Sequence, residues 1–118
     1  MVLVDDDPMY RKLFVSAGES INISINAFDS LSEMVSFAHL RDYELAVIDY
    51  HLESITGEEI AEYIDIFFPN LPLIIISADE DLENKLFIPK SVKKFFSKSS
   101  NPYLIIEESV ALMDDLKT

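Results

Sequence analysis

Residues 2–8 read Val-Leu-Val-Asp-Asp-Asp-Pro, a short apolar run followed at once by three carboxylates and a proline. A continuous apolar run of this length predicts a strand that is buried on both faces, from Val2 to Val4. Asp7 before Pro8 predicts the start of a helix, because Asp is a favoured N-cap residue and Pro fits the first helical position. The stretch therefore predicts a strand, a carboxylate-rich junction and a helix.

The same alternation of strand and helix continues along the chain. Further strand-like runs cover residues 21–27, 45–48, 71–76 and 92–96. Later helix starts are indicated by Ser30 with Glu33, by Thr56 with Glu59 and by Asn101 before Pro102. The pattern predicts an α/β fold of the (βα)5 type, a doubly wound parallel five-stranded sheet with helices on both faces. The helix expected between residues 79 and 89 should be short or irregular, because Pro89 cannot lie in a helix interior.

Length and composition exclude several classes of protein. The chain has 118 residues, of which 49% are hydrophobic, and this predicts one domain over residues 1–118. The absence of cysteine excludes a disulfide scaffold, a thiolate zinc site and thiol catalysis, and it fits a cytoplasmic location. No apolar stretch approaches the roughly 20 residues of a membrane-spanning helix, so we expect no membrane association.

The charge balance is strongly acidic. Nine Lys and Arg residues against 22 Asp and Glu residues give a net charge of −13, so we expect no direct binding to nucleic acid. Five of the nine basic residues lie between Lys85 and Lys98. This cluster is either a solvated edge or a surface that binds a partner.

Polar residues follow the strand-like runs, where ligands bind in an open parallel sheet. The residues at these positions are Asp5, Asp6, Asp49, Ser77 and Lys98. Three carboxylates at one edge would repel one another, and a hard divalent cation with oxygen ligands compensates such a charge. We therefore predict a Mg²⁺ (or Mn²⁺) site formed by Asp5, Asp6 and Asp49, with Asp7 serving only as the helix cap.

Asp49 can act as a nucleophile toward a phosphoryl donor when a metal lies beside it. Lys98 is placed to supply an ammonium group to the same site. Ser77 either donates a hydrogen bond to a phosphoryl oxygen or caps the next helix. For His51 we favour the backbone carbonyl over the ring as a metal ligand, because hard cations prefer oxygen; His39 is expected to be a surface residue.

The chain resembles the receiver domains of two-component response regulators, the CheY-like family. The resemblance rests on four segments, which are 2–8, 46–49 with Gly57, 75–78 and 95–98. It implies a flavodoxin-like fold with the strand order 2-1-3-4-5. It also implies that a histidine kinase or a histidine phosphotransfer protein phosphorylates the chain.

The resemblance implies a role for each site residue. Asp49 would be the phosphoacceptor, Asp5 and Asp6 would hold Mg²⁺, and the His51 carbonyl would complete the protein ligands. Ser77 and Lys98 would bind the phosphoryl oxygens. The aromatic residue of the switch would be Phe95, and phosphorylation would remodel the surface around the fourth helix, fifth strand and fifth helix. The output partner is not specified, and a weak homodimer is left open.

The chain departs from the family pattern at three places. Glu53 replaces a proline in the loop after Asp49, Ser99 replaces the proline after Lys98, and the fourth helix is poorly marked. A cis peptide before a residue other than proline costs about 2.5–4 kcal/mol. We therefore expect a trans bond between Lys98 and Ser99, and we expect the flexible lysine still to reach Asp49.

Two other functions remain open at this stage. Asp5 and Asp7 imitate the Asp-x-Asp motif of haloacid-dehalogenase-like phosphatases, which are true hydrolases. A receiver-shaped docking module that is never phosphorylated is the other alternative. Under the receiver interpretation the chain is not an enzyme, and it would at most phosphorylate itself from small donors and dephosphorylate itself.

Overall fold

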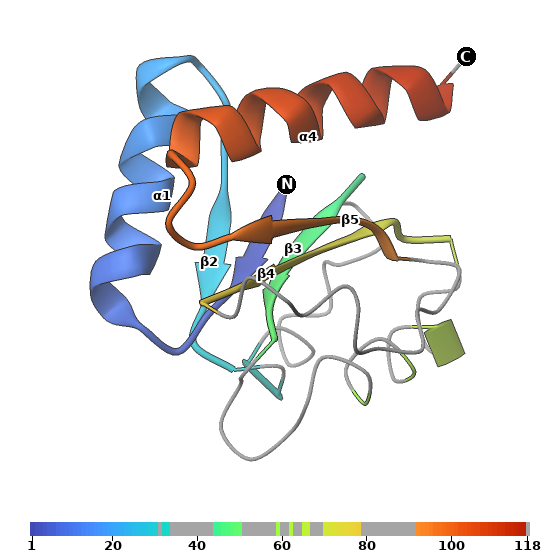
Figure 1. The fold of residues 1–118 in the computed structure, drawn as a ribbon, viewed down its shortest axis with the longest axis horizontal. Helices are drawn as coiled ribbons and strands as arrows, with labels where there is room; N and C mark the ends of the chain where they lie inside the picture. The colour runs from blue at the N-terminus through green and yellow to red at the C-terminus, as the bar shows by residue number, and fades with distance from the viewer. Residues whose placement is uncertain are drawn as a thin grey trace.

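The computed structural model describes residues 1–30, 32–33, 44–50, 59, 62, 65–66, 70–78 and 92–117. Its elements are β1 (Val2–Val4), α1 (Pro8–Ser20), β2 (Asn26–Phe28), β3 (Ala46–Asp49), β4 (Leu73–Ser77), β5 (Val92–Ser97) and α4 (Pro102–Lys117) (Figure 1). None of the helices in this part of the chain is long and apolar enough to cross a membrane.

The five strands form one parallel sheet in the order β2-β1-β3-β4-β5. The order confirms the predicted flavodoxin-like topology. Val4 pairs with Ile48, and Asp49 pairs with Ile76. Ser77 pairs with Ser97 at the end of the next pair of strands. The last residues of β1, β3, β4 and β5 therefore reach the same edge of the sheet.

The three central strands are buried on both faces. Leu3, Val47 and Ile74 belong to one core cluster, which also contains Phe14 of α1 and Ile105 and Ile106 of α4. The alternate residues Val2, Ala46 and Leu73 point to the other face and are fully buried as well. Figure 1 shows α1 and α4 side by side, and the two helices are in contact. The continuous apolar runs are therefore strands covered on both faces, as the sequence predicts.

Helix α1 begins and ends with identifiable caps. The Asp7 carboxylate accepts a hydrogen bond from the Met9 N–H at 3.0 Å, and Pro8 is the first helical residue. At the other end, Asn22 has a φ of 62°, and the N–H of Ile23 donates to the Gly18 carbonyl at 2.8 Å. This is the hydrogen-bond pattern of a Schellman motif, in which Asn is tolerated at the left-handed position.

This C-terminal cap corrects the prediction of a strand over residues 21–27. Strand β2 begins only at Asn26, because residues 21–23 form the C-terminal cap that follows α1. Ile21, Ile23 and Ile25 alternate like the apolar residues of a strand, but they contact the core as the chain turns away from the helix. Alternation alone could not distinguish these two arrangements.

The other predicted helix starts lie partly within the described residues. The Glu33 N–H donates to Ser30 Oγ at 3.1 Å, and the Tyr103 N–H donates to Asn101 Oδ1 at 2.9 Å, as expected of N-caps. Thr56 and the segment 79–89 lie outside the described residues.

Substitution of Gly18 by Ala should destabilise the protein. A Cβ at this position would lie 2.5 Å from Ile25 Cδ1 and 2.8 Å from the Ile23 carbonyl oxygen, which belongs to the backbone and cannot rotate away. Overpacking costs about 1–3 kcal/mol, which exceeds the gain of about 1 kcal/mol in helix propensity. We expect Gly18→Ala to lower the urea midpoint, whereas Ser16→Ala on the exposed face of α1 should leave it unchanged or raise it. A Gly18→Ala midpoint at or above that of the parent chain would contradict this packing.

Candidate functional site

The carboxylates of Asp5 and Asp49 lie at the ends of β1 and β3, which are neighbours in the sheet. Asp5 is fully buried and Asp49 is 5% exposed, whereas Asp6 is exposed. Oxygen atoms from these three carboxylates all lie within 4.8 Å of one another. The structure thus brings together the three acidic residues that the sequence predicts as a metal site.

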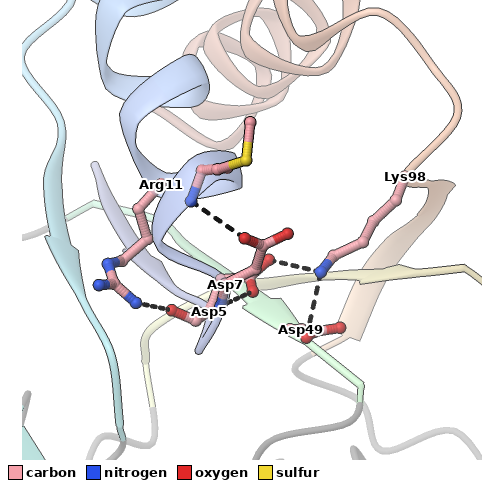
Figure 2. A network of polar contacts seen from close by, with 6 residues as sticks. Asp5, Asp7, Arg11, Asp49 and Lys98 are labelled. Carbon is pink, nitrogen blue, oxygen red and sulfur yellow. Dashed lines mark hydrogen bonds and ion pairs between the residues drawn. The ribbon is translucent and has the colours of Figure 1, made fainter.

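The Lys98 ammonium lies between the two buried carboxylates (Figure 2). It is 2.8 Å from Asp5 Oδ2 and donates a hydrogen bond to Asp49 Oδ2 at 3.3 Å. The contact with Asp5 is an ion pair rather than an aligned hydrogen bond, and the described residues give Asp5 Oδ2 no hydrogen-bond donor. The predicted pairing of Lys98 with Asp49 is confirmed.

The surroundings of Lys98 favour its charged form. Burial alone would lower the pKa of the ammonium, but the interactions with Asp5 and Asp49 outweigh it, so the pKa is raised above 10.5. The ammonium therefore stays charged at neutral pH. It is the cation that makes the burial of two carboxylates tolerable.

Lys98 follows directly after β5 and enters a turn held by two serines. Ser97 Oγ lies 2.7 Å from Ser99 Oγ and accepts a hydrogen bond from the Ser99 N–H at 3.2 Å. The described backbone contains no cis peptide bond, so the bond from Lys98 to Ser99 is trans, as predicted. The lysine stem bridges the remaining distance to the carboxylates.

Ser77 is the last residue of β4 and is 2% exposed, at the same edge as Asp49. Its carbonyl accepts a hydrogen bond from the Lys98 N–H at 2.8 Å. Phe95 is half-buried in β5 and pairs with Ile75 of β4. The predicted residues Ser77, Lys98 and Phe95 are thus connected through the β4–β5 pair. His39, His51 and Glu53 lie outside the described residues.

Two residues of α1 contact the site and were not singled out from the sequence. Arg11 Nη1 donates to the Asp5 carbonyl oxygen at 2.8 Å (Figure 2). The ring of Tyr10 faces the Lys98 ammonium, with 4.9 Å between the nitrogen and the ring centroid. Both lie about one helical turn after the Asp7 cap, on the side of α1 that faces Asp5. This spacing from the predicted N-cap is the sequence feature that could have identified them.

The donors present fit a hard divalent cation. Asp5, Asp6 and Asp49 offer carboxylate oxygens, the ligands that Mg²⁺ prefers. Three carboxylates and one ammonium leave two negative charges in this group, the charge that a divalent cation neutralises. Asp6 is exposed, so the group is accessible from solvent on one side.

Substitution of Lys98 by Met should destabilise the metal-free protein, because it leaves Asp5 and Asp49 buried without a cation. We expect a loss of about 3 kcal/mol in the free energy of unfolding, the low end for a broken buried ion pair because Lys98 is partly exposed, with partial recovery in Mg²⁺. Lys94→Met is the matched control, since the Lys94 ion pair with Glu108 is exposed and should contribute less than about 1 kcal/mol. Chemical denaturation with and without Mg²⁺ measures both. Equal losses for the two variants would show that Lys98 does not compensate the buried charge.

Comparison with known proteins agrees with this geometry. The family model of the response regulator receiver domain matches residues 1–109. A search of curated protein sequences found no significant match. Among solved structures, the receiver domain of the Francisella response regulator 1452 superposes with a TM-score of 0.83 at 22% identity, covering 98% of this chain and 96% of that one.

Two further structures show the same fold. A CheY-like receiver domain protein from Methanospirillum hungatei JF-1 has a TM-score of 0.81 at 21% identity, covering 98% of this chain and 94% of that one. The response regulator TrrA from Thermotoga maritima, solved in complex with Mg²⁺-BeF, has a TM-score of 0.79 at 21% identity, covering 95% and 96%. Since the family model spans most of the sequence, the chain belongs to the response regulator receiver domains of two-component systems.

Proposed function

We propose that Asp49 is the residue of this receiver domain that accepts the phosphoryl group. The observation that carries the proposal is the position of its carboxylate, which lies at the end of a central strand beside Asp5, Asp6 and the Lys98 ammonium. The donor would be a histidine kinase or a histidine phosphotransfer protein, which would place the chain in the cytoplasm. The receiver domain would extend over residues 1–118.

In the reaction, an Asp49 oxygen forms a bond to phosphorus while the bond from phosphorus to the donor imidazole breaks, and the imidazole leaves with the electron pair. A bound divalent cation would neutralise charge on the phosphoryl oxygens. Lys98 lies 3.3 Å from Asp49 Oδ2 and would contact a phosphoryl oxygen attached there. Arg11 donates to the backbone carbonyl of Asp5, and the Asp7 N–H donates to Asp5 Oδ1 at 2.9 Å, which orients the Asp5 carboxylate.

The cation would be Mg²⁺ or Mn²⁺. We assign Asp5, Asp6 and Asp49 as its carboxylate ligands and the His51 backbone carbonyl as a further ligand. The carboxylates are supported by the closeness of their oxygens. The His51 assignment rests on the family resemblance alone.

The residues after β4 and within β5 would transmit the change. Ser77 would hydrogen-bond a phosphoryl oxygen, and a movement of Ser77 would act on Lys98 because the two residues share a backbone hydrogen bond. Phe95 would follow, since it pairs with Ile75, two residue pairs before the pair of Ser77 with Ser97. The surface around β5, α4 and the helix expected between residues 79 and 89 would then switch between two conformational populations.

The structure disfavours a haloacid-dehalogenase-like phosphatase. Asp7, the second acid of the apparent Asp-x-Asp motif, is used to cap α1. The other acidic pair, Asp114 and Asp115, is exposed on α4 rather than placed at a strand end. The presence of Asp5, Asp6, Asp49, Ser77 and Lys98 together at one edge of the sheet argues against a module that only docks.

Acetyl phosphate with Mg²⁺ should add one phosphoryl group to the parent chain, as measured by intact mass. Asp49→Asn should abolish the gain because the nucleophile is lost, and Asp6→Asn should slow it because a metal ligand is lost. Asp7→Asn is the matched control, since Asn caps a helix as well as Asp does and the labelling rate should be retained. Undiminished labelling of Asp49→Asn would refute the assignment of the nucleophile.

Phosphorylation should also change the NMR signals of Phe95 and its neighbours in β5, because Ser77 and Lys98 both contact the new group. The amide and ring signals of the chain can be followed before and after addition of acetyl phosphate and Mg²⁺. Signals of β2, on the opposite edge of the sheet, serve as the internal control. Changes restricted to the Asp49 loop, with β5 unaffected, would refute the proposed coupling.

A further inference from the structure

We propose that Tyr10 is a positioning residue for Lys98, whose aromatic ring holds the ammonium in place between Asp5 and Asp49. The contact itself is independent of phosphorylation. Its consequence for phosphoryl transfer rests on the function proposed above.

The geometry of the ring is suited to this role. The Lys98 nitrogen lies 4.9 Å from the centroid of the Tyr10 ring, within the range of a cation–π interaction. Tyr10 is only 9% exposed, so the ring meets the cation in a largely desolvated place, where such contacts are strongest. The ammonium is therefore bounded by two carboxylate oxygens and one aromatic face.

The ring is itself fixed by the core. Its centroid lies 6.0 Å from that of Phe14, one turn further along α1, with an angle of 34° between the ring planes. Phe14 is fully buried against the sheet. The position of Tyr10 is thus set by the packing of α1, and the ring can act as a rigid support for a mobile side chain.

Lys98 benefits from such a support because its side chain is long and flexible. The lysine side chain has four rotatable bonds and loses considerable conformational entropy when it is held in one geometry. A favourable contact with the Tyr10 ring, in addition to the two ion pairs, restricts the positions that the ammonium occupies.

The hydroxyl group of Tyr10 contributes differently from the ring. It is buried and has no hydrogen-bond partner among the described residues. Burial, together with the charges of Asp5 and Asp49, raises the pKa of Tyr10 to about 12, so the hydroxyl stays neutral. The two parts of the side chain can therefore be separated by substitution, because Tyr10→Phe removes only the hydroxyl and Tyr10→Leu removes the aromatic face.

The first test uses NMR of the unphosphorylated parent chain. Protons held over an aromatic face are shifted upfield, so the ε-methylene protons of Lys98 should lie upfield of those of the exposed Lys94. Tyr10→Phe should keep this shift and Tyr10→Leu should abolish it. A Lys98 signal at the position of Lys94 in the parent chain would overturn the proposal.

The second test separates positioning from core packing by a double-mutant cycle in denaturant, without any phosphoryl donor. The loss in the folding equilibrium constant caused by Tyr10→Leu should be about fivefold smaller in the Lys98→Met background, because the cation–π contact is already absent there. Equal losses in both backgrounds would show that Tyr10 serves the core alone and would overturn the proposal. Neither this cycle nor the NMR shift depends on Asp49 being the phosphoacceptor.

The third test measures the consequence for the reaction. Tyr10→Leu should slow phosphorylation by acetyl phosphate by about fivefold, and Tyr10→Phe should restore most of the rate. Equal slowing by both substitutions would assign the effect to the hydroxyl and contradict the role of the ring. Should the parent chain take up no phosphoryl group, the proposed function fails, and the shift and the cycle still decide the position of Lys98.

Discussion

The ion pairs of one ammonium with two buried carboxylates are the constraint on which the remainder of the site depends. Asp5 and Asp49 lie at the ends of adjacent strands, and burying two carboxylates side by side is costly unless a cation lies next to them. Lys98 supplies that cation from the residue after β5, a strand that is separated from β3 by β4. Because of this strand order, the side chain that carries the cation must be long enough to reach past β4. The hydrogen bond from the Lys98 N–H to the Ser77 carbonyl fixes the backbone position from which that side chain extends.

The parallel sheet turns this local charge balance into a site that can change state. Because all strands run in one direction, the ends of β1, β3, β4 and β5 meet at one edge, and their side chains act on the same small volume. A phosphoryl group on Asp49 would bring new negative charge into this volume. The Lys98 ammonium would then interact with the phosphoryl oxygens as well as with the carboxylates of Asp5 and Asp49. The Lys98 N–H donates to the Ser77 carbonyl, so under the proposed function a rearrangement at the site would act on the strand that carries Phe95.

The sequence was sufficient for those parts of the fold that local chemistry decides. Continuous apolar runs identified β1, β3 and β4, and the strand-like segment 92–96 identified β5. The polar residues at the ends of these strands identified the acidic group and Lys98. The start of β2 was predicted wrongly. The isoleucines at positions 21, 23 and 25 alternate as in a strand, but Asn22 adopts the left-handed conformation of a helix cap and the strand starts only at Asn26. Tyr10 and Arg11 were missed for another reason: their importance depends on the direction in which the first turn of α1 faces, which only the packed structure defines.

The most direct measurement of the central claim is the chemical identification of the phosphorylated residue. An aspartyl phosphate is a mixed anhydride, so borohydride reduces its carbonyl to an alcohol and converts the residue to homoserine, while an unmodified carboxylate is left intact. After reaction with acetyl phosphate and Mg²⁺, reduction and peptide mass mapping, the account predicts homoserine at position 49 and intact carboxylates at Asp5 and Asp6. Homoserine at either of those positions, with Asp49 unchanged, would contradict it.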